Sequence, residues 1–202
     1  GSQAQAGSQA QAGSQAQAQA QARPHAAAWL RQRTAGASVS AAGVVRVCFV
    51  CHGNICRSPT AEGVLRHFIK INNLGDKVEV DSAGTHGYHV GEAPDSRTQR
   101  AASARGYNLS QLRARKVARQ DLEYFDLILA MDKSNLDNLK RLATPEQQDR
   151  LGLFMNYSRN FDDEEVPDPY YGLGHGFDLV LDMVEDASLG LVEEIKKKLN
   201  RA

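Results

Sequence analysis

The chain has 202 residues, enough for one domain with a substantial core but too few for two catalytic domains. Its 24 basic and 24 acidic residues leave no net charge, so it lacks the basic excess of a nucleic-acid-binding protein. The sequence contains no run of about eighteen apolar residues, so it predicts no membrane-spanning helix. The three cysteines all lie between residues 48 and 56, which excludes a disulfide framework across the fold and favours a cytoplasmic, reducing location.

The first 43 residues differ in composition from the rest of the chain. Residues 1–22 repeat Gly-Ser-Gln-Ala and Gln-Ala units, have nothing to bury and are predicted to be disordered. Residues 23–43 are rich in Ala and Arg and contain no acidic residue, a weak similarity to an organellar transit peptide. A functionless leader or an artificial tail is the preferred interpretation, and the initial Gly-Ser resembles a cleavage scar. We expect one domain over residues 44–202.

From residue 44 onwards, strand-like and helix-like segments alternate. Short runs rich in β-branched and apolar residues predict strands over 44–50, 78–82, 126–130 and 151–155. Apolar residues at helical spacing predict helices over 59–69, 96–105, 134–142 and 177–199, with Ser58 and Ser134 as N-caps. This alternation is typical of an α/β fold with a four-stranded parallel sheet and helices on both faces. Such sheets bind ligands at the carboxyl ends of their strands.

The segment that joins the first strand to the first helix is the candidate site. It reads Cys51-His52-Gly53-Asn54-Ile55-Cys56-Arg57-Ser58, and we expect its backbone from His52 to Ser58 to bind phosphate. Ser58 suits an N-cap and Pro59 the first helical residue, so the segment should end at a helix N-terminus, where N–H groups and the helix dipole attract anions. Gly53 would let the backbone approach the anion closely.

Two side chains of this segment predict chemistry beyond binding. A cysteine near a helix N-terminus and a cation is favoured as the thiolate, which makes Cys51 a candidate nucleophile. Arg57 has a planar fork that can bind two phosphoryl oxygens at once. The segment therefore combines a nucleophile, a phosphate cradle and a clamp. Asp168, which lies between two prolines, is held stiffly enough to face a pocket.

Three motifs together resemble the low-molecular-weight protein tyrosine phosphatases: CHGNICRSP at residues 51–59, DSAGT at 81–85 and DPYY at 168–171. The resemblance covers residues 44–202. It implies metal-independent hydrolysis of protein phosphotyrosine and small aryl phosphates through a cysteinyl-phosphate, with no cofactor. Its partners would be phosphotyrosine proteins and, by analogy, a cognate tyrosine kinase.

The resemblance also implies roles for single residues. Cys51 would be the nucleophile, Arg57 the phosphate clamp and Asp168 the general acid. The loop-supporting residues would be Asn54, Ser58 and Ser82; the substrate cleft would be lined by His52, Tyr88, Tyr170 and Tyr171; and the redox pair would be Cys51 and Cys56. In vertebrate members a histidine precedes a glycine in the loop-supporting network, and Arg105 before Gly106 stands in its place here.

Several other interpretations compete with this one. Cys48, Cys51 and His52 form a C-x-x-C-H haem-attachment pattern, and the three cysteines with a histidine could bind zinc. Both are weak because Cys48 falls inside an apolar strand, where it is expected to be a core residue. Arsenate reductases that use their own resolving cysteines need a pair downstream, and no cysteine follows Cys56. Protein-arginine phosphatases tend to have Thr where Ile55 stands. A phosphoprotein-binding module would lack the nucleophile or the acid, and both are present.

Overall fold

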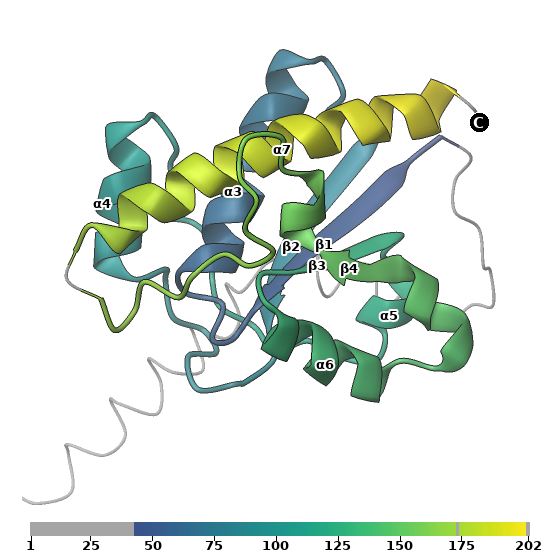
Figure 1. Ribbon diagram of the computed structural model, residues 1–202, viewed down its shortest axis with the longest axis horizontal. Helices are drawn as coiled ribbons and strands as arrows, with labels where there is room; N and C mark the ends of the chain where they lie inside the picture. The colour runs from purple at the N-terminus through teal and green to yellow at the C-terminus, as the bar shows by residue number, and fades with distance from the viewer. Residues whose placement is uncertain (1–42, 173, 201–202) are drawn as a thin grey trace, which may run out of the picture. The chain divides into compact units, whose positions relative to one another are not determined.

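Four apolar segments form a parallel sheet in the order β2-β1-β3-β4 (Figure 1). The computed structural model describes residues 43–172 and 174–200, so the predictions for residues 1–42 lie outside the described residues. The strands are β1 (Val45–Cys51), β2 (Val78–Gly84), β3 (Leu127–Ala130) and β4 (Leu151–Leu153). The helices are α3 (Arg57–Ile71), α4 (Ser96–Ala104), α5 (Asp121–Tyr124), α6 (Lys133–Leu142) and α7 (Gly176–Asn200), with two 3-10 turns, η1 (Pro145–Arg150) and η2 (Phe154–Tyr157).

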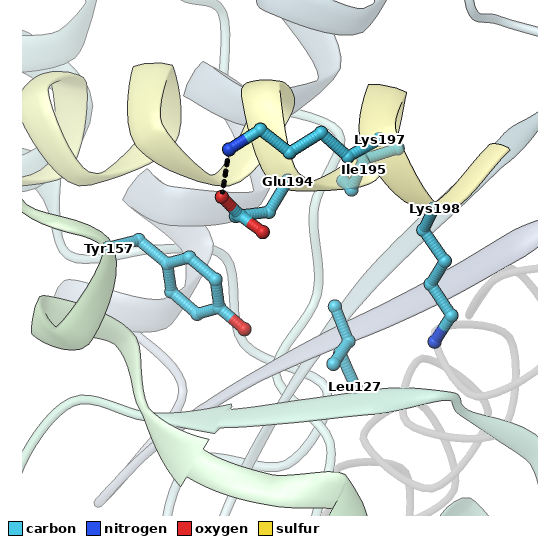
Figure 2. A pocket seen from close by; sticks show the side chains of 6 residues that line it. All are labelled: Leu127, Tyr157, Glu194, Ile195, Lys197 and Lys198. Atoms are coloured by element: carbon cyan, nitrogen blue, oxygen red, sulfur yellow. Dashed lines mark hydrogen bonds and ion pairs between the residues drawn. The ribbon is translucent and has the colours of Figure 1, made fainter. Parts of the chain in front are cut away.

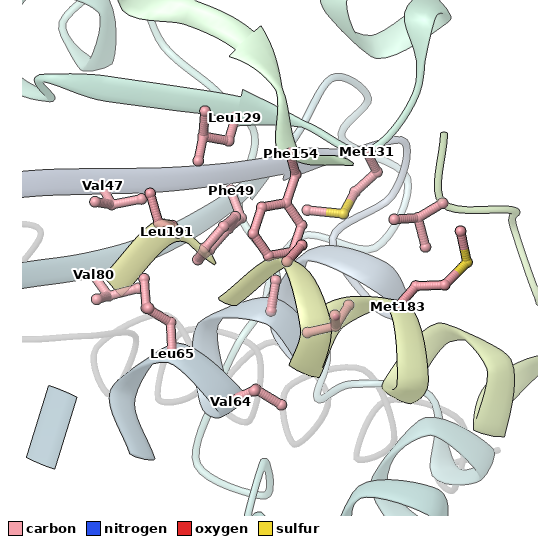
Figure 3. Packing of buried hydrophobic residues seen from close by; sticks show 14 of the residues in the cluster. Val47, Phe49, Val64, Leu65, Val80, Leu129, Met131, Phe154, Met183 and Leu191 are labelled. Carbon is pink, nitrogen blue, oxygen red and sulfur yellow. The ribbon is translucent and has the colours of Figure 1, made fainter. Parts of the chain in front are cut away.

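Helices cover both faces of the sheet, as predicted. Figure 1 shows α3, α4 and α7 on one side and α5 and α6 on the other. Because side chains alternate along a strand, Val47 and Phe49 of β1 join the larger core under α3 and α7, where Figure 3 shows Phe49 close to Phe154. Cys48 and Val50 face the smaller core under α5 and α6.

The centre of the sheet sets the position of the site. β1 pairs with β2 from Val45 opposite Val78 to Cys51 opposite Gly84, and it pairs with β3 on its other edge. The chain therefore changes direction across the sheet at β1 and β3. Their carboxyl ends border the crevice where open α/β sheets bind ligands. Cys51 ends β1, and Asp132 follows the end of β3 by two residues.

Helix starts differ from the predicted caps. Helix α3 begins at Arg57, with Cys56 at the N-cap, so Ser58 and Pro59 lie within the first turn and Ser58 is not the cap. The hydroxyl of Ser58 is used by the site instead of the helix end. Helix α6 is capped by Asp132, whose Oδ1 accepts from the backbone N–H of Asn135 at 2.7 Å, so Ser134 is not its cap.

Other boundaries moved by a few residues. Strand β2 runs two residues past its predicted end, to Gly84, and β4 stops at Leu153 because the chain then turns into η2. Helix α7 and η2 approach each other closely at Gly190. A Cβ there would lie 1.9 Å from the carbonyl oxygen of Tyr157, so only glycine fits. No helix among the described residues combines the length and the apolar character that crossing a membrane requires.

Candidate active site

The thiol of Cys51 lies at the floor of the loop of residues 51–58, here called the Cys51 loop. Cys51 is only 3% exposed, at the end of the central strand. Its Sγ lies 3.0 Å from Oγ of Ser58, and the backbone N–H of Asn54 donates to it at 3.3 Å. Donors to sulfur stabilise its anionic form over the neutral form. Two polar groups from the same loop therefore converge on this sulfur.

A buried polar network fixes the orientation of those donors. Asn54 adopts a left-handed backbone (φ 58°), which asparagine tolerates. Its Nδ2 donates to Oγ of Ser58 at 2.8 Å and to Oγ of Ser82 at 2.9 Å, while its Oδ1 accepts from the backbone N–H of Arg115 at 3.0 Å. Ser82 donates in turn to Oε1 of Glu62 at 2.7 Å. Since Ser58 accepts from Asn54, its own proton is available to the sulfur.

Arg115, and not Arg105, supports the Cys51 loop. The guanidinium of Arg115 is anchored to Asp81 at 3.0 Å and to Asp121 at 2.9 Å, which holds its backbone N–H against Asn54. Arg105 instead pairs with Asp182 of α7 at 2.8 Å. The side chain of Arg105, the residue that precedes Gly106 where vertebrate members have a histidine, is therefore directed to α7.

Arg57 is held rigidly at the opposite side of the thiol. It is 2% exposed, and its Nη1 donates to Oδ2 of Asp132 at 2.6 Å and to the carbonyl of Val166 at 3.0 Å. Its Nη2 lies 3.5 Å from Oδ2 of Asp168. Burial opposes the charge, but Cys51, Asp132 and Asp168 outweigh it and raise the pKa of Arg57 above its usual value. Arg57 is thus a fixed cation beside the sulfur.

A cavity of about 460 Å³ opens above this floor. Most of the predicted site residues line it: Cys51, His52, Gly53, Ile55, Cys56, Arg57, Tyr88, Asp168, Tyr170 and Tyr171. Asn54, Ser58 and Ser82 are buried and do not line the cavity. Tyr88 is 72% exposed and Tyr171 is 89% exposed, so these rings stand at the rim, whereas Tyr170, at 38%, stands lower, with the guanidinium of Arg97 5.5 Å from its ring centre. The rings therefore border the mouth of the cleft and do not wall a deep slot.

The two other cysteines have different environments. Burial raises the pKa of Cys56 to about 12, an effect that a hydrogen bond with Thr98 partly offsets, so this thiol stays protonated at neutral pH. Cys48 is fully buried in the core on the opposite face of the sheet from Cys51. The haem-attachment pattern is therefore not met, because its two thiols point to different faces. In the described part of the chain, no group of three or more His, Cys, Asp or Glu side chains is arranged to hold a metal ion.

A smaller cavity of about 280 Å³ lies at the other end of the sheet, where β3 begins. Figure 2 shows that Tyr157 and Leu127 line it together with the end of α7. Lys197 there is paired with Glu194 at 2.9 Å. No thiol lines this cavity, and the candidate site is therefore the Cys51 loop.

Sequence reasoning missed three residues of the site. Asp132 could have been found, because it follows a buried strand whose carboxyl end meets that of β1. Glu62 and Arg115 gave no signal. Their importance depends on contacts between segments far apart in the chain, such as the 61 residues that separate Arg115 from Asn54.

Comparison with known proteins places this geometry in a family. The model of the family described as low molecular weight phosphotyrosine protein phosphatase matches residues 46–201. A low molecular weight protein-tyrosine-phosphatase of Streptomyces coelicolor is 43% identical over 160 residues, which cover 76% of this chain and 95% of the relative. The crystal structure of a protein tyrosine phosphatase from Entamoeba histolytica superposes with a TM-score of 0.74 at 37% identity, covering 76% of this chain and 98% of that one.

A further solved structure, described as a Drosophila arginine phosphatase, superposes with a TM-score of 0.69 at 35% identity and covers 74% of this chain and 97% of that one. The fold is thus shared by proteins named for two phosphoamino acids. The family match spans nearly the whole described chain, and the chain belongs to the low molecular weight phosphotyrosine protein phosphatase family.

Proposed function

We propose that this protein hydrolyses phosphotyrosine in proteins, and small aryl phosphates, with Cys51 as the nucleophile. The observation that carries the proposal is the position of the Cys51 sulfur: it lies between the Ser58 hydroxyl and the Asn54 N–H, on the floor of a cavity that Arg57 and Asp168 also line. Nucleophile, clamp and proton donor therefore meet in one place.

In the first step, the thiolate of Cys51 attacks phosphorus in line with the tyrosyl oxygen. The S–P bond forms as the P–O bond breaks, and the protonated carboxyl of Asp168 gives its proton to the leaving phenolate. Loop N–H groups and Arg57 hold the remaining phosphoryl oxygens. Because Asp132 and Val166 bind Nη1, the edge of the guanidinium formed by Nε and Nη2 can be presented to two of these oxygens.

In the second step, water attacks the cysteinyl-phosphate. The carboxylate of Asp168 takes one proton from that water, the S–P bond breaks, and inorganic phosphate leaves. The hydroxyl of Ser58 stabilises the departing thiolate of Cys51. Each group thus returns to its starting state without a metal or a cofactor.

The lining of the cavity favours a phenyl ring over a phosphoguanidine group. Ile55, which is 8% exposed, and Tyr170 both line the cavity. An apolar side chain suits the face of an aromatic ring, whereas it would desolvate a polar guanidine without a hydrogen bond. Phosphotyrosine proteins are therefore the proposed partners, with a cognate tyrosine kinase as their source. A reducing cytosol, which keeps the thiol of Cys51 available, is the proposed location.

The test is turnover of a phosphotyrosine peptide and of phenyl phosphate. Wild-type protein should hydrolyse both, vanadate should inhibit, and EDTA should have no effect. Cys51→Ser should fold and lose at least about a thousandfold in kcat, because a serine alkoxide is not available near neutral pH. Cys48→Ser is the matched control, since it makes the same change at a buried thiol on the other face of the sheet. Residual activity in Cys51→Ser above that level, or an equal loss in Cys48→Ser, would refute the assignment.

A further inference from the structure

Two histidines and a tyrosine form a stacked cluster at the mouth of the cleft. The ring centroids of His52 and His86 are 4.0 Å apart, with 27° between the ring planes. Tyr88 stacks on His86 at 5.5 Å, nearly parallel at 8°, and lies 6.0 Å from His52. His52 and Tyr88 line the cavity, and both are exposed. This cluster is therefore a surface that a bound substrate would meet.

Thr85 prepares His86 to donate a hydrogen bond. Oγ1 of Thr85 lies 2.8 Å from Nδ1 of His86, and it also lies 3.5 Å from the backbone carbonyl of His52. When His86 is neutral, the Thr85 hydroxyl can donate to Nδ1, which puts the ring proton on Nε2. When His86 is charged, Nδ1 donates to Thr85, whose hydroxyl can then donate to the His52 carbonyl. Both states of His86 keep a donor at Nε2.

The charges that surround His86 are all positive or able to become so. Lys116 pairs through its backbone with Gly84 at the end of β2, and its aliphatic stem runs past Gly87. Burial, and then the neighbouring His52 and Lys116, lower the pKa of His86 below its usual value. A negative charge placed beside His86 would therefore favour its protonated form.

Two other basic side chains nearby already have carboxylate partners. His89 pairs with Glu92 at 2.8 Å, and Arg97 pairs with Asp95 at 2.9 Å. Within residues 43–172 and 174–200, neither His52 nor His86 nor Lys116 has a carboxylate within ion-pair distance. The corner of the mouth formed by His52, His86 and Lys116 therefore holds basic side chains that no carboxylate of the described residues pairs with.

We propose that His52, His86 and Lys116 form a subsite for a carboxylate of the substrate, so that the enzyme prefers phosphotyrosine with an Asp or Glu close by in the chain. The proposal rests on the proposed function, because it concerns the same cleft. An incoming carboxylate would favour the charged histidines, and by linkage the charged histidines would favour the carboxylate. The preference should therefore strengthen as the pH falls from 7.5 to 5.5.

The test compares two phosphotyrosine peptides that differ only by Glu or Gln at the positions next to the phosphotyrosine. The phosphate titrates alike in both peptides, and Glu stays largely ionised at pH 5.5, so the ratio of their kcat/KM values isolates the carboxylate. We expect a Glu-to-Gln ratio of about five at pH 5.5, typical of an exposed ion pair, and below about two at pH 7.5. Added salt should reduce the ratio.

Variants assign the effect to the subsite. His86→Gln should flatten the pH dependence of the ratio, and Lys116→Gln should lower the ratio at every pH. Lys70→Gln, which removes an exposed charge from the far end of α3, should leave the ratio unchanged. All three should turn over phenyl phosphate within about twofold of wild type, because that substrate has no carboxylate. Lys116→Arg should restore the ratio lost in Lys116→Gln.

The outcomes separate the two proposals. Normal turnover of phenyl phosphate, with a ratio near one at every pH or with full pH dependence retained in His86→Gln, would overturn the subsite alone. If the wild-type protein does not hydrolyse phenyl phosphate, or does so without Cys51, the proposed function is overturned and the subsite with it.

Discussion

At the scale of single residues, the contacts of Arg57 depend on the shape of its guanidinium as well as on its charge. Its Nη1 is bound by Asp132 and Val166, and its Nη2 faces Asp168, so each part of the guanidinium has a defined direction. A lysine ammonium would keep the charge but could not reproduce this set of contacts. It would also remove the 2.6 Å hydrogen bond that Nη1 donates to the carboxylate of Asp132.

Arg57→Lys should therefore lose about a hundredfold to a thousandfold in kcat, the usual cost of removing a donor that stabilises a transition state. Steady-state kinetics on phosphotyrosine peptide measures this loss. Arg100→Lys, the same change at an exposed arginine of α4, is the control. Activity near that of wild type in Arg57→Lys would argue against bidentate binding of the phosphoryl group.

Asp168 offers a sharper test, because the need for a general acid depends on the leaving group. A tyrosine phenolate, with a conjugate-acid pKa of about 10, leaves poorly unless it is protonated, whereas a nitrophenolate leaves readily. Asp168→Asn should lose about a hundredfold to ten-thousandfold on phenyl phosphate and much less on an activated aryl phosphate, measured by the burst phase. Asp163→Asn is the matched control on the same loop. An equal loss on all leaving groups would mean that Asp168 only shapes the loop.

At the scale of elements, the Cys51 loop holds two thiols in different environments, one on the floor of the cavity and one hydrogen-bonded to Thr98. The pKa of Cys56 is raised to about 12, chiefly by burial, so Cys56 is unreactive on its own at neutral pH. Peroxide should first oxidise Cys51 to the sulfenic acid, which the Cys56 thiol can attack to form a disulfide with loss of water.

Wild-type protein treated with peroxide should then recover its activity in dithiothreitol, and mass spectrometry of the loop peptide should show the loss of two hydrogens. Cys56→Ala should recover less, because its Cys51 proceeds to irreversible oxidation states. Recovery of Cys56→Ala equal to that of wild type would rule out a protective disulfide.

Helix α7 packs closely against η2 because position 190 is a glycine. A Cβ at position 190 would lie 1.9 Å from the backbone oxygen of Tyr157, which cannot move aside like a flexible side chain. Gly190→Ala should therefore lower the free energy of unfolding by about 3 kcal/mol, measured by urea denaturation. Gly75→Ala, at a position with nothing within 4 Å, should change it by less than about 0.5 kcal/mol. Equal effects at the two positions would contradict this packing argument.

Strands and long helices could be predicted from the sequence because their signals are local. The four strands of the sheet and the face of α7 follow from runs and spacing of apolar residues, which need no knowledge of the partner. Helix starts could not be placed to the residue, because Ser58 has two possible uses and the choice depends on where the Cys51 sulfur lies. Helix α5, with four residues, is too short for any periodicity to show.

The site divides in the same way. The proposed nucleophile and clamp occupy one continuous motif, so the sequence predicts them together. The support from Glu62 and Arg115 arises only when β2, the segment before α5 and the Cys51 loop are brought together. The position of Arg105 before a glycine does not reveal its partners, which are Asp182 and Glu185 of α7.

At the scale of the whole molecule, one cysteine and two tyrosines that titrate at high pH make the free energy of unfolding depend on pH. Burial is the largest cause that raises the pKa of Cys56 from 9.0, and that of Tyr107 and Tyr124 from 10.0, each to about 12. The folded protein therefore binds these protons more tightly than the unfolded chain does. Between about pH 9 and 12 the unfolded state binds fewer protons, so stability must fall as the pH rises.

The urea midpoint should thus be lower at pH 10.5 than at pH 8. Tyr107→Phe and Cys56→Ala remove one such proton each and should lose less stability over this interval, although each starts from a different midpoint. A midpoint that is the same at both pH values, or an undiminished slope in both variants, would show that these groups are not coupled to unfolding.

The distance along the chain between Cys51 and Asp168 has a consequence for biosynthesis. A ribosome makes the nucleophile early and the proposed acid 117 residues later, by the difference of their numbers. Between them it must make Ser82, Arg115 and Asp132, each of which holds part of the pocket. A nascent chain therefore emerges with its thiol long before it has any means of turnover. If Asp168 is the acid, turnover requires that the chain be made at least as far as this residue, so the onset of activity would report a late step of folding.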